Sequence, residues 1–256
     1  MMDLLYAEAI RFGLTLNTSH LAAFEQYYHE LADWNARFNL TAITSYEDVQ
    51  RKHFLDSLIC FLALPDAKLG DANSDSIALR HGERKMSFAD VGSGAGFPGL
   101  PLKIFCPAMH LTLIEATLKK TLFLQHIVDL LQLSDVEIIC ARAEEAGQDR
   151  AHREQYDVVL ARAVAGLNVL AEYCLPLLRV GGRWIAQKGE GIEGEILAMS
   201  EALRVLGGEM KAVKPYDLNQ VSGTRYLVVV DKIAHTPASY PRRIGIPSKR
   251  PLVSVG

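Results

Sequence analysis

Apolar residues in the first 65 positions recur with helical spacing. Leu21, Phe24 and Leu31 return to one face every three or four residues, which is the period of an amphipathic helix. Ser19 stands at the start of this stripe and has a side chain that can cap a helix. A second periodic stretch follows. The pattern predicts a helical extension over residues 1–65, with helices at about 19–38 and 46–62.

From residue 87 onward the pattern changes to short apolar runs that alternate with amphipathic stretches. The runs have the length of buried strands, and the stretches between them have the length of helices. Such alternation predicts βαβ units, and hence a Rossmann-like α/β fold around a mostly parallel sheet. Strands are expected at about 87–91, 110–115, 136–140, 156–161 and 182–187, and helices at about 98–105, 117–132, 166–178 and 192–206.

The end of the chain departs from this alternation. Two strand-like runs at about 208–214 and 225–231 follow one another directly, so we expect an antiparallel hairpin at the sheet edge. Residues 87–233 would then form the main domain, preceded by an exposed polar connector, 66–86. The tail, 234–256, holds four of the chain's ten prolines, which favours an extended arm over a packed element.

Composition is typical of a soluble globular protein. Hydrophobic residues make up 49% of the chain and charged residues 22%, and no apolar run approaches the roughly 18 residues that cross a bilayer. The N-terminus is acidic where a signal peptide needs basic residues, so we expect a cytoplasmic protein. The four cysteines form no C-x-x-C pair, so buried thiols are expected and no metal site. Nothing demands more than a monomer.

Charge is distributed unevenly. From Lys232 to the C-terminus there are five Lys or Arg and no Asp or Glu, whereas the rest holds 22 basic and 30 acidic residues. The tail therefore carries +5 and the body −8, which indicates a basic arm on an acidic body. Such an arm either contacts the phosphates of an anionic partner such as RNA, through Arg242, Arg243, Lys249 and Arg250, or is merely solvated.

A glycine-rich loop follows the first predicted strand, in the run Asp90-Val-Gly-Ser-Gly-Ala-Gly-Phe-Pro-Gly99. Its glycines permit positive φ and remove Cβ atoms that would block the close approach of a ligand. Pro98 begins a helix, whose free N–H groups would favour that ligand. Because the run also satisfies the dinucleotide fingerprint G-x-G-x-x-G, it predicts a cofactor without fixing which one.

Three neighbouring features bear on the choice of cofactor. Asp90 can brace the loop or accept from a cofactor ammonium group. Glu115 ends the second strand, where a carboxylate can bind both hydroxyls of a ribose in either cofactor class. Arg142-Ala-Glu-Glu145 follows the third strand, where an adenine would lie. The terminal hairpin favours a methyltransferase that uses S-adenosylmethionine (SAM). An NAD(P)-dependent oxidoreductase is the alternative, and a binding module without turnover is a weaker one.

These motifs resemble those of one family, the bacterial 16S rRNA guanine-N7 methyltransferases once called glucose-inhibited division protein B. The resemblance implies a class I SAM-dependent fold, and transfer of a methyl group to N7 of a guanine in the decoding-region loop of 16S rRNA in the small ribosomal subunit. It is carried by the glycine loop and by Trp34–Thr41, His53–Ser57, Arg142–Glu144, Ala161–Ala163, Lys188–Gly189 and Thr236–Arg243.

Motifs and resemblance together give candidate residues for each role. The cofactor-binding candidates are Asp90, Gly92, Ser93, Gly94, Gly96, Phe97, Glu115, Ala143, Glu144 and Arg162. The RNA-binding candidates are Lys119, Lys120, Lys188, Arg242, Arg243, Lys249 and Arg250. Where the family has Lys-Arg this chain has Lys119-Lys120, which loses the bidentate fork of an arginine.

No catalytic residue can be assigned, and the chemistry explains why. Guanine N7 carries a lone pair and no proton, so its methylation needs placement in line with the methyl group and no general base. The residues that could lie near the reacting atoms are Arg162, Lys188, Asn39 and His53. Each could instead be a structural hydrogen-bonding or ion-pairing group, and Asp56 could serve to fix His53.

Overall fold

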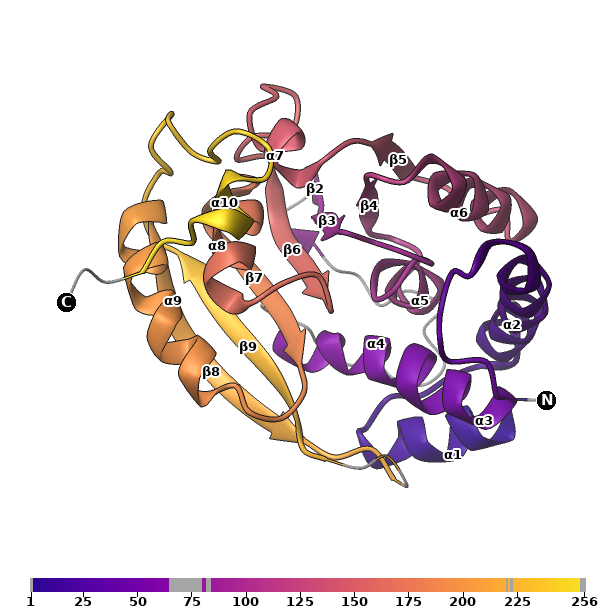
Figure 1. Cartoon of the computed structure of the whole chain (residues 1–256). Coiled ribbons are helices and arrows are strands. Elements are labelled where there is room, and N and C mark those ends of the chain that lie inside the picture. Colours follow the sequence, from indigo (N-terminus) through magenta and orange to yellow (C-terminus); the bar gives the residue numbers. More distant parts are fainter. Residues whose placement is uncertain (1, 65–79, 82–83, 220, 222, 254–256) are drawn as a thin grey trace.

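The chain is built around one seven-stranded mixed sheet with helices on both faces (Figure 1). The computed structural model describes residues 2–64, 80–81, 84–219, 221 and 223–253. The strands of the sheet are β3 (Ser87–Val91), β4 (His110–Glu115), β5 (Val136–Cys140), β6 (Tyr156–Arg162), β7 (Leu178–Lys188), β8 (Gly208–Tyr216) and β9 (Arg225–Lys232). All seven expected strands are confirmed, and β7 begins earlier than expected, which shortens the helix before it.

The strand order brings the ends of β3 and β6 together. The order is β5-β4-β3-β6-β7-β9-β8, with the first five strands parallel and β9 antiparallel to both of its neighbours. The expected hairpin at the sheet edge is therefore confirmed. The chain runs outward from β3 through β4 and β5, and then returns to β6 on the other side of β3. Ligands of such sheets bind at this switch point, beyond the carboxyl ends of the strands.

Side chains alternate along the strands between two hydrophobic cores. The helices of the main domain are α5 (Gly99–Phe105), α6 (Leu118–Leu130), α7 (Ala143–Ala146), α8 (Leu167–Cys174) and α9 (Glu193–Leu206). In β6, Val158 and Leu160 pack toward the N-terminal helices and toward helices α5 and α6 of the main domain. Val159 and Ala161 pack on the other face, toward helices α8 and α9. Strands buried on both faces explain why the apolar runs in the sequence are continuous.

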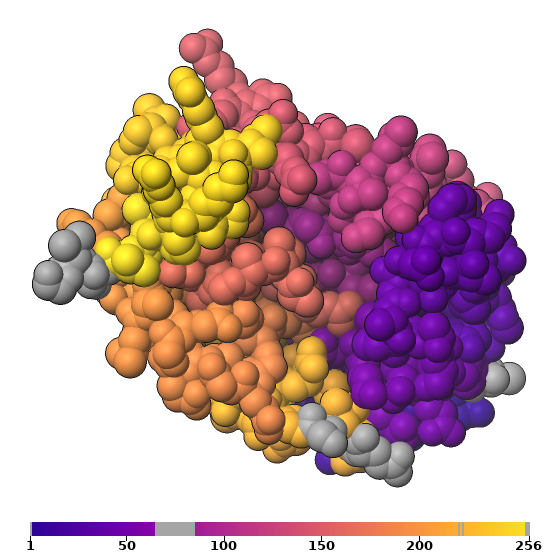
Figure 2. All heavy atoms as spheres, in the orientation of Figure 1, coloured from indigo at the N-terminus to yellow at the C-terminus, as the bar shows by residue number. Residues whose placement is uncertain are grey.

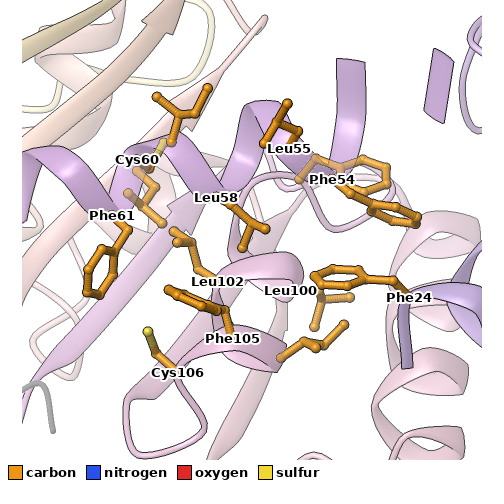
Figure 3. Packing of buried hydrophobic residues seen from close by; sticks show 14 of the residues in the cluster. Phe24, Phe54, Leu55, Leu58, Cys60, Phe61, Leu100, Leu102, Phe105 and Cys106 are labelled. Atoms are coloured by element: carbon orange, nitrogen blue, oxygen red, sulfur yellow. The ribbon is translucent and has the colours of Figure 1, made fainter. Parts of the chain in front are cut away.

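The N-terminal extension is helical, as expected, and packs against α5 (Figure 3). Phe24 and Phe54 lie in one cluster with Leu100 of α5. The ring centroids of the two phenylalanines are 4.9 Å apart. The cap of α2 is Asn17, whose side chain accepts the N–H of His20 at 2.8 Å, so the expected cap at residue 19 is wrong. The elements are α1 (Asp3–Arg11), α2 (Thr18–Phe38), α3 (Tyr46–Val49), a π-helical turn (Gln50–Leu55), α4 (Asp56–Ile59) and a 3-10 turn (Cys60–Ala63).

The C-terminal tail is packed, so the expectation of an extended arm is wrong. Its described part folds back over α7 and α8 and contains the short helix α10 (Ile246–Lys249) (Figure 1). Arg153 donates hydrogen bonds to the tail carbonyls of Thr236, Pro237 and Tyr240. Proline spacing was a poor guide because these carbonyls find a partner on the protein instead of water.

Most of the expected connector, 66–86, lies outside the described residues. Its described part contains two short strands, β1 (Arg80–His81) and β2 (Arg84–Lys85), which pair antiparallel. In the described part of the chain, no helix has the length and apolar character needed to cross a membrane.

Candidate functional site

A cavity of about 620 Å³ opens at the carboxyl ends of β3, β4, β5 and β6. Loops that are far apart in the sequence meet there because the strands that precede them are parallel neighbours. In Figure 2 the N-terminal helices and the C-terminal tail flank these loops from opposite sides. The main domain contributes most of the lining: 91–95, Phe97, 114–117, Lys120, 141–144, 162–165 and Tyr173. The N-terminal extension adds Leu40, Thr41 and His53, and the C-terminal tail adds Ser248.

The glycine loop has positive φ at three of its glycines, and Gly92 and Gly96 show most clearly why glycine is required. Gly92 has φ +70° and Gly96 has φ +94°, a region that other residues rarely adopt. A Cβ on Gly92 would lie 2.7 Å from a methyl carbon of Val164, and one on Gly96 would collide with the hydroxyl of Tyr27. Tyr27, on α2, donates its hydroxyl proton to the carbonyl of Ala95. The N-terminal extension therefore holds the loop, a role that the apolar stripe alone did not reveal.

Asp90 braces the loop from beneath. Its Oδ2 accepts the N–H of Gly99 at 2.8 Å, while its Oδ1 is buried without a hydrogen-bond partner. The first N–H of α5 is therefore occupied by Asp90, and the expectation that this helix end is free for a ligand is wrong. Of the two roles considered for Asp90, the geometry supports bracing. Gly96 likewise shapes the loop, and neither residue lines the cavity.

Burial raises the pKa of Asp90 to about 7, against the opposing effects of the Gly99 N–H and the charge of Arg162. The same carboxyl in an unfolded chain has a pKa near 3.8. Between these two values the folded protein holds a proton that the unfolded chain releases. The contribution of Asp90 to stability is therefore lost as the pH rises from about 4 to about 7.

Replacing Asp90 by asparagine is expected to remove this dependence on pH. Relative to the wild type, the free energy of unfolding of the variant should rise between pH 4 and pH 7, by up to about 4 kcal/mol for a difference of about three pKa units. Urea denaturation of both proteins at the two pH values measures it. If the difference between them does not change with pH, Asp90 ionises in the folded protein as it does in the unfolded chain.

Glu115 is held with its carboxylate in the cavity. Its Oε2 accepts the N–H of Gly94 at 3.0 Å, and its Oε1 accepts the N–H of Thr117 at 2.8 Å. Each oxygen retains a lone pair for a further donor. A fixed carboxylate of this kind is suited to a pair of neighbouring hydroxyls, such as those of a ribose.

Arg162 ends β6 at the other side of the glycine loop. Its guanidinium donates to the carbonyl of Lys52 at 2.9 Å and to Nδ1 of His53 at 2.9 Å, and lies 5.1 Å from the centroid of the Phe97 ring. His53 stacks on Phe97 with centroids 4.2 Å apart. The expected sites Phe97, His53 and Arg162 thus form one cluster at the cavity.

His53 is neutral in this cluster. Burial and the charge of Arg162 lower its pKa to about 3. Its Nδ1 accepts from Arg162, so its Nε2 carries the proton and lies 2.8 Å from Oγ1 of Thr41. An imidazole with both nitrogens engaged positions its neighbours and is not available as a base.

Asp56 was considered as a residue that fixes His53, but its carboxylate binds other side chains. It is completely buried between Arg162, whose Nη1 is 3.1 Å away, and Arg225, whose Nε is 2.7 Å away. The hydroxyl of Tyr216 also donates to it at 2.7 Å. Asp56 therefore connects the N-terminal extension to β6, β8 and β9, and sequence reasoning gave no sign of these partners.

Two other candidates lie outside the cavity lining. Asn39 ends α2 with φ +50°, so its exposed side chain stands at a left-handed cap position that asparagine tolerates. Lys188 pairs with Glu195 at 2.8 Å and donates to the carbonyl of Ala165 at 3.1 Å. Lys188 thus supports the loop after β6, which lines the cavity, without lining the cavity itself.

The expected RNA-binding cations are placed in different ways. Lys120 lines the cavity, while the neighbouring Lys119 donates to the carbonyl of Phe38 at 3.1 Å. Arg242 forms a bidentate pair with Glu172 of α8, a side chain only 1% exposed, and so anchors the tail. The other cations of the tail are exposed: Arg243, Lys249 and Arg250.

The remaining cofactor candidates also line the cavity. Ser93 and Gly94 belong to the loop, and Ala143 and Glu144 lie on the side of β5. No group of His, Cys, Asp or Glu within the described ranges is arranged to hold a metal ion. The mixed sheet with its antiparallel edge hairpin, the glycine loop at its switch point and the acid at the end of β4 are the features expected of a class I SAM-dependent methyltransferase.

Comparison with known proteins gives the family. The family model described as rRNA small subunit methyltransferase G matches residues 20–222. A protein of Roseiflexus castenholzii named ribosomal RNA small subunit methyltransferase G is 48% identical over 98% of this chain and 100% of its own length. A protein of the same name from Lactobacillus johnsonii is 41% identical over 96% of this chain and 97% of its own length.

The chain therefore belongs to the rRNA small subunit methyltransferase G family. Full-length similarity to methyltransferases disfavours the oxidoreductase that the glycine loop alone had left open. Among solved structures, a 16S rRNA (adenine(1408)-N(1))-methyltransferase from Catenulisporales acidiphilia is similar over 59% of this chain and 90% of its own length, at 12% identity and a TM-score of 0.48.

Proposed function

We propose that this protein transfers a methyl group from SAM to N7 of a guanine in the decoding-region loop of 16S rRNA, acting in the cytoplasm on the small ribosomal subunit. The observation that carries the proposal is the cavity at the switch point, where the fixed carboxylate of Glu115 faces the glycine loop. Relatives named for methylation of small-subunit rRNA support the choice of substrate.

The residues of the cavity fit SAM in size and chemistry. A cavity of about 620 Å³ lies within the usual range for small-molecule sites. Glu115 would accept the two ribose hydroxyls, and Ala143 and Glu144 would lie beside the adenine. Gly92 and Gly94 leave room for the backbone to approach the ligand closely. When bound, SAM supplies an electrophilic methyl group on a sulfonium.

The residues around this site bind and orient, and none has to remove a proton. Guanine N7 attacks through its lone pair, so the rate depends on holding the base in line with the methyl group. His53 is neutral and hydrogen-bonded on both sides, which suits a positioning role. Arg162, fixed by four groups of the protein, keeps the wall of the cavity in one geometry.

Cations at the cavity and on the tail would neutralise RNA phosphates. Lys120 stands at the cavity itself, and Arg243, Lys249 and Arg250 lie exposed on the tail. Contacts of this kind set the affinity and its dependence on salt, and carry no base specificity. Arg242 is expected to contribute little to RNA binding, because its guanidinium is committed to Glu172.

Thermal unfolding with added ligands tests the class of cofactor. S-adenosylhomocysteine at about one hundred times its Kd should add about 2.7 kcal/mol to the free energy of unfolding, which corresponds to a rise in Tm of about 5–10 °C. NADH and NADPH at equal concentrations are the matched ligands and should leave Tm unchanged. A rise with NADH and none with S-adenosylhomocysteine would overturn the proposal.

A further inference from the structure

The C-terminal tail is attached to the main domain by buried polar anchors along its length. At its start, the hydroxyl of Thr236 donates to the carbonyl of Leu206 at 2.8 Å and accepts a hydrogen bond from the buried ammonium group of Lys232. In its middle, Arg242 pairs through both side chain and backbone with Glu172. These contacts fix the tail in one position on α8, which a merely solvated arm would not need.

The far end of the tail reaches the cofactor cavity. The N–H of Gly245 donates to Oε1 of Glu144 at 2.9 Å, and Glu144 lines the cavity. Three residues further on, Ser248 of α10 lines the same cavity, as does Tyr173 of α8, and the hydroxyl of Ser248 donates to the carbonyl of Gly245 at 3.1 Å. Glu144, a wall residue of the cavity, therefore has its hydrogen-bond partner on the tail.

We propose that the docked tail, residues 235–253, is a wall of the SAM site, with Ser248 and Tyr173 enclosing the adenosyl end of the cofactor. The position follows from the cavity lining, since Gly245 of the tail donates to Glu144, which follows Ala143 on the side of β5, and Ser248 lies three residues further on. The inference rests on the proposed function, because it takes the cavity to be the SAM site.

The arrangement makes tail docking and cofactor binding favour each other. A ligand that contacts the docked tail binds that state more tightly than the undocked one, so binding shifts the tail toward docking. By the same linkage, loss of docking weakens the ligand by the same factor. The tail thus has a role at the cofactor in addition to the phosphate contacts expected of its exposed cations.

A pair of tryptophan variants tests the wall directly. Ser248→Trp places a bulky side chain at the cavity, and Ser239→Trp places the same side chain at another exposed serine of the tail that does not line it. By titration calorimetry, Ser248→Trp should bind S-adenosylhomocysteine at least tenfold more weakly than the wild type, and Ser239→Trp within about twofold. Circular dichroism confirms that both variants are folded.

Limited proteolysis of the unmodified chain supplies the reciprocal measurement. Trypsin cleavage after the exposed Arg243 and Lys249 should slow severalfold in saturating S-adenosylhomocysteine, while cleavage at Arg11, which lies in α1, should not. The inference would be overturned if the two tryptophan variants bound S-adenosylhomocysteine with equal affinity, or if the ligand did not change the rate of tail cleavage. In either case the proposed function would still stand, provided that the wild type binds S-adenosylhomocysteine. A wild type that binds no S-adenosylhomocysteine would overturn both.

Discussion

Replacing Glu115 by glutamine is expected to weaken the binding of S-adenosylhomocysteine by about 100-fold. The carboxylate is already oriented by the N–H groups of Gly94 and Thr117, so its remaining lone pairs face the ligand without further ordering. Hydrogen bonds to a charged acceptor contribute about 1.5–3 kcal/mol, and glutamine both removes the charge and turns one acceptor into a donor. Titration calorimetry with the purified variant measures the change.

Glu137→Gln is the matched control for this experiment. Glu137 lies on the neighbouring strand β5, is exposed and does not line the cavity, so its replacement should leave the affinity unaltered. If Glu115→Gln binds the ligand as tightly as Glu137→Gln does, the ribose does not lie at the end of β4 and the cofactor is placed wrongly in this cavity.

Replacing Asp56 by alanine is expected to lower the free energy of unfolding by about 3–5 kcal/mol. The carboxylate is completely buried and shared by Arg162 and Arg225, and the loss of one partner of a buried ion pair leaves uncompensated charge. The variant should also bind S-adenosylhomocysteine less well, because Arg162 loses the contact that orients it. Chemical denaturation and calorimetry on the same preparation give the two values.

An exposed aspartate provides the comparison for Asp56. Asp48 pairs with Lys52 at 2.9 Å on the surface, with 41% of its side chain exposed, so Asp48→Ala should change stability little. If Asp56→Ala is no less stable than Asp48→Ala, the buried cluster does not hold the N-terminal extension against the sheet.

The fold was largely predictable because its signals are local. Strands buried on both faces give continuous apolar runs, and β3 to β6 were placed within a residue of their ends. The glycine loop was equally clear, since positive φ and close approach at Gly92 demand a residue type that is visible in the sequence. The role of Glu115 in cofactor binding, which was inferred from its position at the end of a strand, stays a prediction.

What escaped prediction depends on contacts between distant segments. The side chains that bind the carboxylate of Asp56 come from β6, β8 and β9, more than 100 residues away, and no spacing rule connects them. The tail has the prolines of an arm, yet it docks because the buried Glu172 and the half-buried Arg153 offer it hydrogen-bond partners. For the same reason Ser248 carried no signal as a cavity residue, since only the docked tail brings it there.

The most direct test of the proposed function is transfer of a labelled methyl group from SAM to small ribosomal subunits that lack the modification. Incorporation is expected into 16S rRNA at a single guanine of the decoding-region loop. The product should be N7-methylguanine, revealed by strand cleavage after reduction and aniline treatment. Large subunits treated in parallel should take up no label. Absence of incorporation into both small subunits and free 16S rRNA, or a methyl group on any atom other than guanine N7, would contradict the proposed function.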